Sequence, residues 1–249
     1  MNKKVSAIAA AIICGIMGTS LFISCSKNNK EEIEDDYQRG LYSEVVPDDG
    51  SNSSKTGITD DDLATRAKTM DVEVAALKAV WKVETGGRGG FLPNDKPVIL
   101  FEGHIFWQQL RARGLNPQNY VKGNEDILYQ KYDKTKYVGG VGEHDRLDRA
   151  IEINEDAALA SASWGMFQTM GYLYEKCGCK TVKEFVTKME ESELAQLDLF
   201  IELLNSNSNM LKALQNLDWQ TFARLYNGPS YAEYHYDEKL AKAYLNYKN

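Results

Sequence analysis

The sequence is poor in the residues that bind nucleic acids and metal ions. Its 249 residues carry 29 Lys and Arg against 36 Asp and Glu, a formal net charge of −7. Binding to DNA or RNA needs clustered basic side chains, so we expect no nucleic-acid partner. The chain has three His, at positions far apart (His104, His144 and His235), without the spacing of a metal site. We therefore expect neither a metal nor another cofactor.

One apolar run stands out in a chain of otherwise low hydropathy, and it lies near the N-terminus. Lys3 and Lys4 precede a run from Val5 to Ile23. A charged start followed by an apolar segment is typical of a secretory signal. A transmembrane helix is the alternative, because the run is nearly long enough to cross a bilayer. The run ends in Leu-Phe-Ile-Ser-Cys at Cys25, which resembles the lipobox of bacterial lipoproteins, where the Cys is lipidated and becomes the new N-terminus.

Three segments are expected: a lipoprotein signal peptide at 1–24, a tether at 25–58 and a catalytic domain at 59–249. The tether is polar and charged and has no apolar period, which is typical of a flexible linker. Its Lys30-Glu31-Glu32 cluster resembles the surface-export signals of some Gram-negative lipoproteins. We expect a lipid anchor at Cys25 that holds the protein on the outer membrane, at the cell surface or the periplasmic face.

The remaining chain predicts a mainly α domain with a small, irregular β part (α+β). Folded structure is expected to begin near Thr59, with Asp60 or Asp61 capping the first helix and Asp71 the second. The stretch 92–142 is expected to be irregular, with one strand at 98–101. Cys177 and Cys179 are too close for an unstrained disulfide, so they are apolar fillers or exposed thiols. Helical patterns are expected at 60–70, 72–84, 145–160, 181–190, 192–205, 207–216, 218–226 and 236–248.

The second of these helices ends in a carboxylate that stands out. Glu84 falls between Leu77 and Val80 on the apolar stripe of the helix, just before four glycines between Gly86 and Gly90. Apolar walls and the negative end of the helix dipole both raise the pKa of a carboxyl group, as a glycosidic general acid requires. A helix-ending Glu that points to solvent is an equal alternative.

Two later segments carry candidate substrate contacts. Ser163, Trp164 and Gln168 lie in a mixture of small polar, aromatic and glycine residues that suits a floor for sugar rings. A Trp-anchored turn in the core is the alternative. Tyr226 and Asn227 offer a hydroxyl and an amide at a helix end, where an ordinary Asn-Gly cap is the alternative.

Together these segments resemble the lysozyme-like superfamily and, more closely, the N-acetylmuramidase domain of phage endolysins and bacterial cell-wall enzymes. Four motifs carry the resemblance in order: 83–91, 97–106, 161–171 and 226–231. It covers about 59–249. One departure is Gly103, where relatives often carry Arg. The resemblance implies a lysozyme-like fold and a glycoside hydrolase that cuts peptidoglycan at the β-1,4 bond between N-acetylmuramic acid and N-acetylglucosamine.

The resemblance leaves several points open. Glu84 is the implied general acid, while a lytic transglycosylase and an inactive peptidoglycan-binding lipoprotein are the alternatives. Glu102, after the strand, is either a second carboxylate that activates water or a structural acid bound to Arg88 or His104, and we favour the structural role. The run from Glu143 to Arg146 is expected to be a solvated helix start. We expect a monomer.

Overall fold

The computed structural model describes residues 55, 57–228 and 231–248, and within them the chain is mainly α-helical with one small sheet. The expected signal peptide, Cys25 and most of the expected tether lie outside the described residues and stay predictions. Within the described residues, no helix is both long and apolar enough to cross a membrane.

The first two helices are α2 (Asp60–Thr69) and α3 (Val74–Thr85). The cap of α2 is Thr59, not Asp60 or Asp61. Its hydroxyl accepts the Asp62 backbone N–H at 3.1 Å, while the Asp62 carboxylate accepts the Thr59 N–H at 2.9 Å. This reciprocal pair satisfies two N–H groups that the first turn of a helix leaves unpaired. Asp71, the expected cap of the second helix, instead lies in the turn with a φ of 54°.

The sheet is antiparallel and has the order β1-β2-β3. Strand β1 (Ile99–Phe101) pairs with β2 (Ala162–Trp164), and β2 pairs with β3 (Thr169–Met170). Helix α4 (Gly103–Ala112) follows β1 directly, inside the stretch expected to be irregular. That expectation was wrong because Phe106, Trp107 and Leu110 recur at helical spacing and are buried. Two 3-10 turns follow, η1 (Pro117–Tyr120) and η2 (Lys134–Lys136).

The rest of the chain is helical, largely where the sequence predicted. The single piece expected at 145–160 is two helices, α5 (Gly142–Ile153) and α6 (Glu155–Ala160), because Asn154 is extended and its side chain caps α6 through the Ala157 N–H. After the turn η3 (Gly171–Leu173) come α7 (Val182–Glu191), α8 (Glu193–Asn205), α9 (Ser208–Gln215), α10 (Trp219–Tyr226) and α11 (Tyr236–Lys248).

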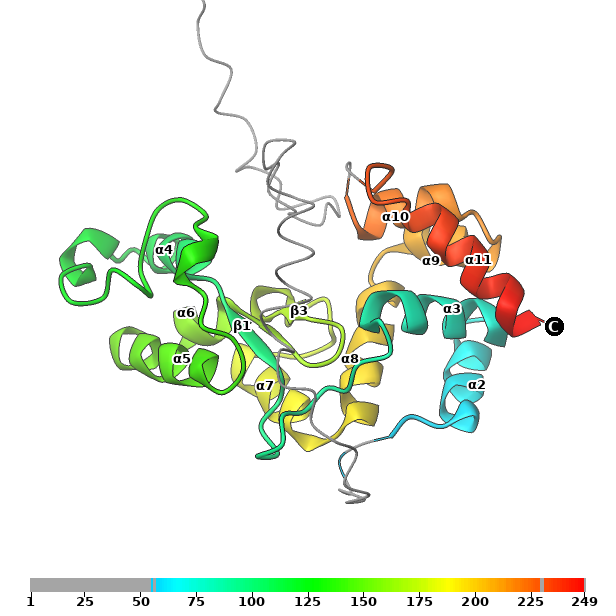
Figure 1. Ribbon diagram of the computed structural model, residues 1–249, viewed down its shortest axis with the longest axis horizontal. Helices are drawn as coiled ribbons and strands as arrows, with labels where there is room; N and C mark the ends of the chain where they lie inside the picture. The colour runs from blue at the N-terminus through cyan, green and yellow to red at the C-terminus, as the bar shows by residue number, and fades with distance from the viewer. Residues whose placement is uncertain (1–54, 56, 229–230, 249) are drawn as a thin grey trace, which may run out of the picture.

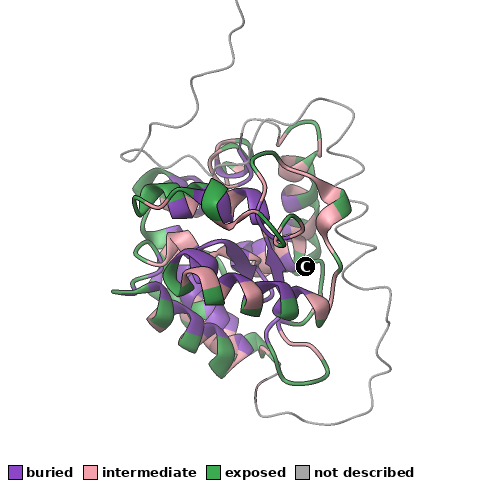
Figure 2. Ribbon diagram, turned by 90° about the vertical axis from the view of Figure 1, so that its left-hand side faces the viewer, coloured by how far each residue is buried: buried purple, intermediate pink, exposed green. Residues whose placement is uncertain are grey.

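The buried side chains form two clusters that share α8. One cluster lies among β1, β2, α4, α5, α6 and α7, and the other among α2, α3, α8, α9, α10 and α11. Figure 1 shows these groups on either side of α8, and Figure 2 shows the buried residues on the inner faces of the helices. The turn between β2 and β3 crosses from one cluster to the other, since Trp164 belongs to the first and Phe167 to the second. The sheet and α8 therefore fix the position of the β2–β3 turn relative to α3.

Cys177 and Cys179 are free and buried, at 1% and 4% exposure. Burial raises the pKa of the Cys177 thiol to about 12, so it stays protonated at neutral pH. They are apolar fillers, and the alternative of exposed thiols is excluded.

Candidate active site

Glu84 lies in the last turn of α3 and is half-buried. Gly86 ends the helix with a left-handed φ of 60°. The buried Thr85 stabilises this end, because its hydroxyl donates to the Trp81 carbonyl at 2.8 Å and accepts the Gly87 N–H at 3.0 Å. Leu77 and Val80, which flank Glu84 on the apolar stripe that the sequence predicted, are fully buried.

Asn227 meets this carboxylate from the other end of the chain. It caps α10 and is 6% exposed, and its side-chain N–H donates to Glu84 Oε1 at 3.3 Å and Oε2 at 3.4 Å. Its own Oδ1 is buried without a hydrogen-bond partner among the described residues. The structure thus brings the first and last motifs together. Asn227 is also the C-cap of α10, so both predictions for this residue are compatible.

Tyr226, the neighbour of Asn227, packs into the second cluster. Its ring stacks on Phe222, with centroids 5.9 Å apart, and meets the edge of Phe200 at 5.7 Å. These contacts fix the end of α10, on which the position of Asn227 depends. The predicted contact of Tyr226 with substrate stays a prediction.

The third motif, at 161–171, forms the β2–β3 turn, and its polar side chains bond within the protein. The Ser163 hydroxyl donates to Gln168 Oε1 at 2.8 Å. Gln168 Nε2 donates to the carbonyls of Gly165 at 2.7 Å and Val98 at 3.3 Å. Gln168 also holds a left-handed φ of 48°, which costs free energy for a residue with a Cβ. The amide therefore stabilises the turn and ties it to the strand region before β1.

Trp164 was predicted to contact substrate, and the structure places it in the core instead. Its side chain is 2% exposed and its indole N–H donates to the Leu159 carbonyl at 3.2 Å. A side chain enclosed in this way cannot pack against a sugar ring without leaving its site. The alternative of a Trp-anchored core turn is the correct one.

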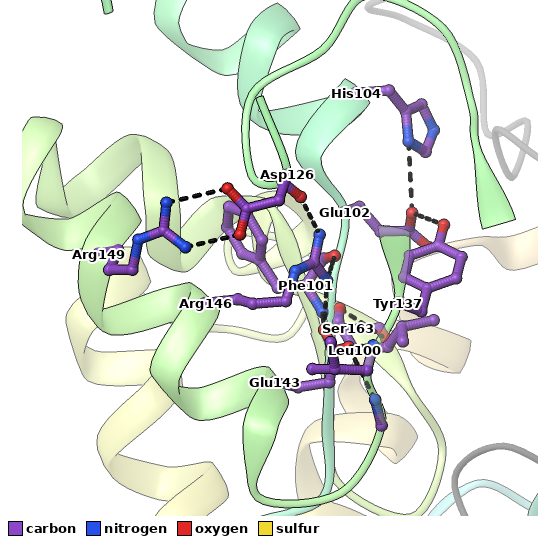
Figure 3. Close-up of polar contacts among 12 residues, drawn as sticks. Leu100, Phe101, Glu102, His104, Asp126, Tyr137, Glu143, Arg146, Arg149 and Ser163 are labelled. Atoms are coloured by element: carbon purple, nitrogen blue, oxygen red, sulfur yellow. Dashed lines mark hydrogen bonds and ion pairs between the residues drawn. The ribbon is translucent and has the colours of Figure 1, made fainter. Parts of the chain in front are cut away.

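Glu102 lies between β1 and α4, and of the two partners expected from the sequence, Arg88 and His104, it contacts His104. The Tyr137 hydroxyl donates to Glu102 Oε2 at 2.5 Å, and His104 Nδ1 lies 3.3 Å from the same oxygen (Figure 3). Burial raises the pKa of the Glu102 carboxyl to about 7, although the Tyr137 hydrogen bond acts in the opposite direction. Burial lowers the pKa of His104 to about 4, so the imidazole is neutral at pH 7. Glu102 is thus a carboxyl that can gain or lose a proton near neutral pH.

The run from Glu143 to Arg146 was expected to be a solvated helix start. That prediction was wrong, because all of its residues except Asp145 are buried. Glu143 is 0% exposed and accepts the backbone N–H groups of Phe101, Val138 and Gly139. Its fourth partner is Arg146, at 2.6 Å, which also donates to the Phe101 carbonyl (Figure 3). A buried ion pair is tolerated where hydrogen bonds satisfy most of the remaining atoms. Here both Glu143 oxygens and both terminal nitrogens of Arg146 are bonded, while Arg146 Nε is buried without a partner among the described residues. The pair fixes the end of β1, next to Glu102.

Gly103 has no room for a side chain. A Cβ there would lie 2.4 Å from the ring of Tyr129 and 2.6 Å from the Ile127 carbonyl oxygen. Tyr129 therefore occupies the space that an Arg at this position would need.

The described part of the chain offers no metal site and one groove away from the predicted site residues. No group of three or more His, Cys, Asp or Glu side chains there could hold a metal ion. A groove between α9 and α10 is lined by Lys212, Asp218 and Arg224, but by none of the predicted site residues.

Two groups near the predicted site could not be anticipated from the sequence. Tyr137 is one of 14 tyrosines and belongs to none of the four motifs. Glu193 and Gln196, in the first turn of α8, bond to the backbone of Gly90 in the loop after Glu84. Only an unusually polar start to an apolar helix could have drawn attention to them.

Comparison with known proteins gives a family and a fold. The model of the Muramidase family, described as N-acetylmuramidase, matches residues 73–248. A solved structure, the crystal structure of Burkholderia AP3 phage endolysin, is 38% identical, with a TM-score of 0.74 over 81% of this chain and 75% of that chain. A search of curated proteins found no match. The mainly α fold with a small sheet is thus the lysozyme-like fold that the motifs implied.

Proposed function

The chain belongs to the N-acetylmuramidase family, and from this premise we propose that it hydrolyses the β-1,4 bond between N-acetylmuramic acid and N-acetylglucosamine, with Glu84 as the general acid. Family membership and the endolysin likeness support the coarser statement, a lysozyme-like glycoside hydrolase of peptidoglycan. The contact between Glu84 and Asn227 supports the more specific proposal, with Glu84 as the general acid. It holds a half-buried carboxyl group in one orientation beside a glycine-rich loop.

In this proposal the protonated Glu84 carboxyl donates its proton to the glycosidic oxygen as the bond to the anomeric carbon breaks. A water oxygen then forms the new bond to that carbon, and the proton it loses passes to a base. Asn227 orients the carboxyl through its side-chain N–H. The product gains one water for each bond cut.

Glu102 is the candidate for the base that receives the proton from water. A pKa of about 7 leaves part of the population ionised at neutral pH, and Tyr137 fixes the orientation of the carboxyl. The structural role favoured from the sequence is the alternative. If Glu102 acts as the base, its replacement by Gln removes turnover while substrate binding persists.

Two alternative functions could use the same site. A lytic transglycosylase uses one carboxyl as acid and then base and releases a 1,6-anhydro sugar without adding water. A catalytically inactive relative would bind peptidoglycan and leave it intact. Digestion of purified peptidoglycan followed by mass spectrometry of the products separates the three. Products that carry one added water per cut support hydrolysis, products without it contradict the proposal in favour of the transglycosylase, and an intact polymer contradicts catalysis.

We also propose the setting in which the domain works. The lipobox-like sequence before Cys25 and the polar stretch that follows support a lipid-anchored protein held on a tether at the outer membrane. The acidic composition supports substrate recognition by shape and hydrogen bonds, without nucleic acid as a partner. We propose that the protein acts as a monomer.

A further inference from the structure

The loop that follows Glu84 is held by the first turn of α8. Four of its five residues from Gly86 to Gly90 are glycine, the residue type that loses most backbone entropy on folding. Such a loop needs ties from outside if the end of α3 is not to fray. Gly90 supplies the attachment point, since it is buried and lies close to α8.

Both sides of the Gly90 backbone are bonded to α8. Its N–H donates to Glu193 Oε1 at 2.7 Å, and its carbonyl accepts from Gln196 Nε2 at 3.3 Å. A Cβ on Gly90 would lie 2.0 Å from Gln196 Oε1, so only glycine permits this approach. Gln196 Oε1 also accepts the Met166 N–H at 2.9 Å, which connects the loop to the β2–β3 turn.

The second carboxylate oxygen of Glu193 binds a different part of the chain. Gly57 donates its N–H to Glu193 Oε2 at 2.7 Å, and the Glu193 N–H donates to the Lys55 carbonyl at 2.8 Å. The Lys55 ammonium lies 5.4 Å from the ring centroid of Phe91, the residue after Gly90. Lys55 and Gly57 both lie ahead of residue 73, where the family match begins.

Glu193 is well suited to this bridge. It is 6% exposed, and a buried carboxylate is costly unless hydrogen bonds satisfy it. Two backbone N–H groups do so, and the first turn of α8 adds the positive end of the helix dipole. Both oxygens act as acceptors, so a neutral amide could satisfy only one of the two N–H groups.

We propose that Glu193 is a positioning residue that links the segment ahead of the family domain, through Gly57, to the loop that follows Glu84. The orientation of the Glu84 carboxyl then depends on residues that the family match does not include. The proposal rests on the role of Glu84 in the proposed function. It makes Lys55 and Gly57 part of the catalytic unit, at the point where the expected tether joins the domain.

The test uses the full chain with one glycine replaced. Gly57 has a φ of +100° and open space around its Cβ position, so Gly57→Ala disfavours the backbone geometry that reaches Glu193 without creating a clash. Gly114→Ala is the matched control, since Gly114 has a φ of +76°, equally open surroundings and a place at the end of α4. A second pair is Glu193→Gln against Glu202→Gln, an exposed acid on the same helix.

The measurements are kcat and KM on soluble peptidoglycan fragments, the melting temperature, and amide hydrogen exchange in a peptide covering 86–91. Gly57→Ala and Glu193→Gln are expected to speed exchange in that peptide and to lower kcat about tenfold with little change in KM, because misplacement of a catalytic group acts on the chemical step. The controls are expected to leave both the exchange in that peptide and kcat unchanged. This should hold even if Gly114→Ala lowers the melting temperature by as much as Gly57→Ala.

Unchanged exchange and kcat in Gly57→Ala, relative to its control, would overturn the proposal. Faster exchange with an unchanged kcat would show that the link exists but does not position Glu84. That outcome would also overturn the proposal. If the wild-type chain does not cleave peptidoglycan, the proposed function is contradicted instead. In that case the exchange result alone decides whether Glu193 couples Gly57 to the loop.

Discussion

The side-chain nitrogen of Asn227 lies 3.3 and 3.4 Å from the two carboxylate oxygens of Glu84, which is 143 positions earlier in the chain. An N–H that donates to a carboxylate stabilises its ionised form, whereas a general acid must be protonated. Asn227 therefore restrains the orientation of Glu84 and also bears on the pH at which Glu84 gives up its proton.

Replacing Asn227 by Asp tests this relationship through the pH profile. A second negative charge beside Glu84 disfavours its ionised form and raises the pKa of the carboxyl group. Because the acid works when protonated, the alkaline limb of the kcat profile is expected to move to higher pH. Asn227→Ala removes the orienting contact and is expected to lower kcat over the whole range. A profile in Asn227→Asp that coincides with that of the wild type would contradict the assignment.

The Glu84→Gln variant tests the proposed acid itself. Gln keeps the shape of Glu and can still accept from Asn227, but it has no acidic proton to donate. Turnover of peptidoglycan is expected to fall by about 10²- to 10⁴-fold, with binding to insoluble peptidoglycan and the melting temperature retained. Glu152→Gln, at an exposed position on α5, is the control for the loss of one charge. Near wild-type turnover in Glu84→Gln would make Glu102 the next candidate.

Glu102 is expected to make stability depend on pH. Its pKa is about 7 in the folded chain against an ordinary value of 4.5, so between these values the folded state binds more protons than the unfolded state. The free energy of unfolding should therefore fall as pH rises from 4.5 through 7, by at most about 3 kcal/mol. Chemical denaturation at pH 5 and pH 8 measures the difference.

The Glu102→Gln variant provides the comparison for that measurement. It cannot ionise, and its amide oxygen can still accept from Tyr137, so most of the fall should disappear. A fall of equal size in wild type and variant would assign the effect to other groups.

Gln168→Ala is expected to cost stability as well as activity. The variant loses the three hydrogen bonds of the Gln168 amide in the β2–β3 turn but keeps the strained backbone, because Ala is also disfavoured at a φ of 48°. The loss should be about 1 to 3 kcal/mol in the free energy of unfolding. Gln118→Ala, at an exposed site, is the control. Reduced activity without any change in stability would instead favour the direct substrate contact predicted from the sequence.

Cys25→Ser tests the proposed anchor. Without the thiol no acyl chain can be attached, so the protein is expected to leave the membrane fraction or to retain its signal segment. Cell fractionation with an antibody against the domain provides the measurement. Signal cleavage together with continued membrane association would rule out the lipid at Cys25.

The sequence by itself determined the family, the helices of the C-terminal half and the position of Glu84 on an apolar stripe at the end of its helix. These follow from local rules: side chains such as Thr181, Ser192, Asn207 and Asp218 cap the helices α7 to α10 that follow them, and the apolar period of each helix faces a cluster. The sequence also presented the four motifs in order, which is enough to recognise a family without any distance.

Only the tertiary structure decided which polar groups meet. It turned Gln168 inward, enclosed Trp164, buried the pair of Glu143 and Arg146, and set Asn227 against Glu84. The contact between Asn227 and Glu84 joins segments 143 positions apart. The pair of Glu143 and Arg146 is local, but only packing against β1 buries it. A polar side chain takes its role from the donors and acceptors that burial leaves within its reach, because an unpaired buried group is costly. These partners come within reach only in the folded chain, where the two buried clusters pack against α8.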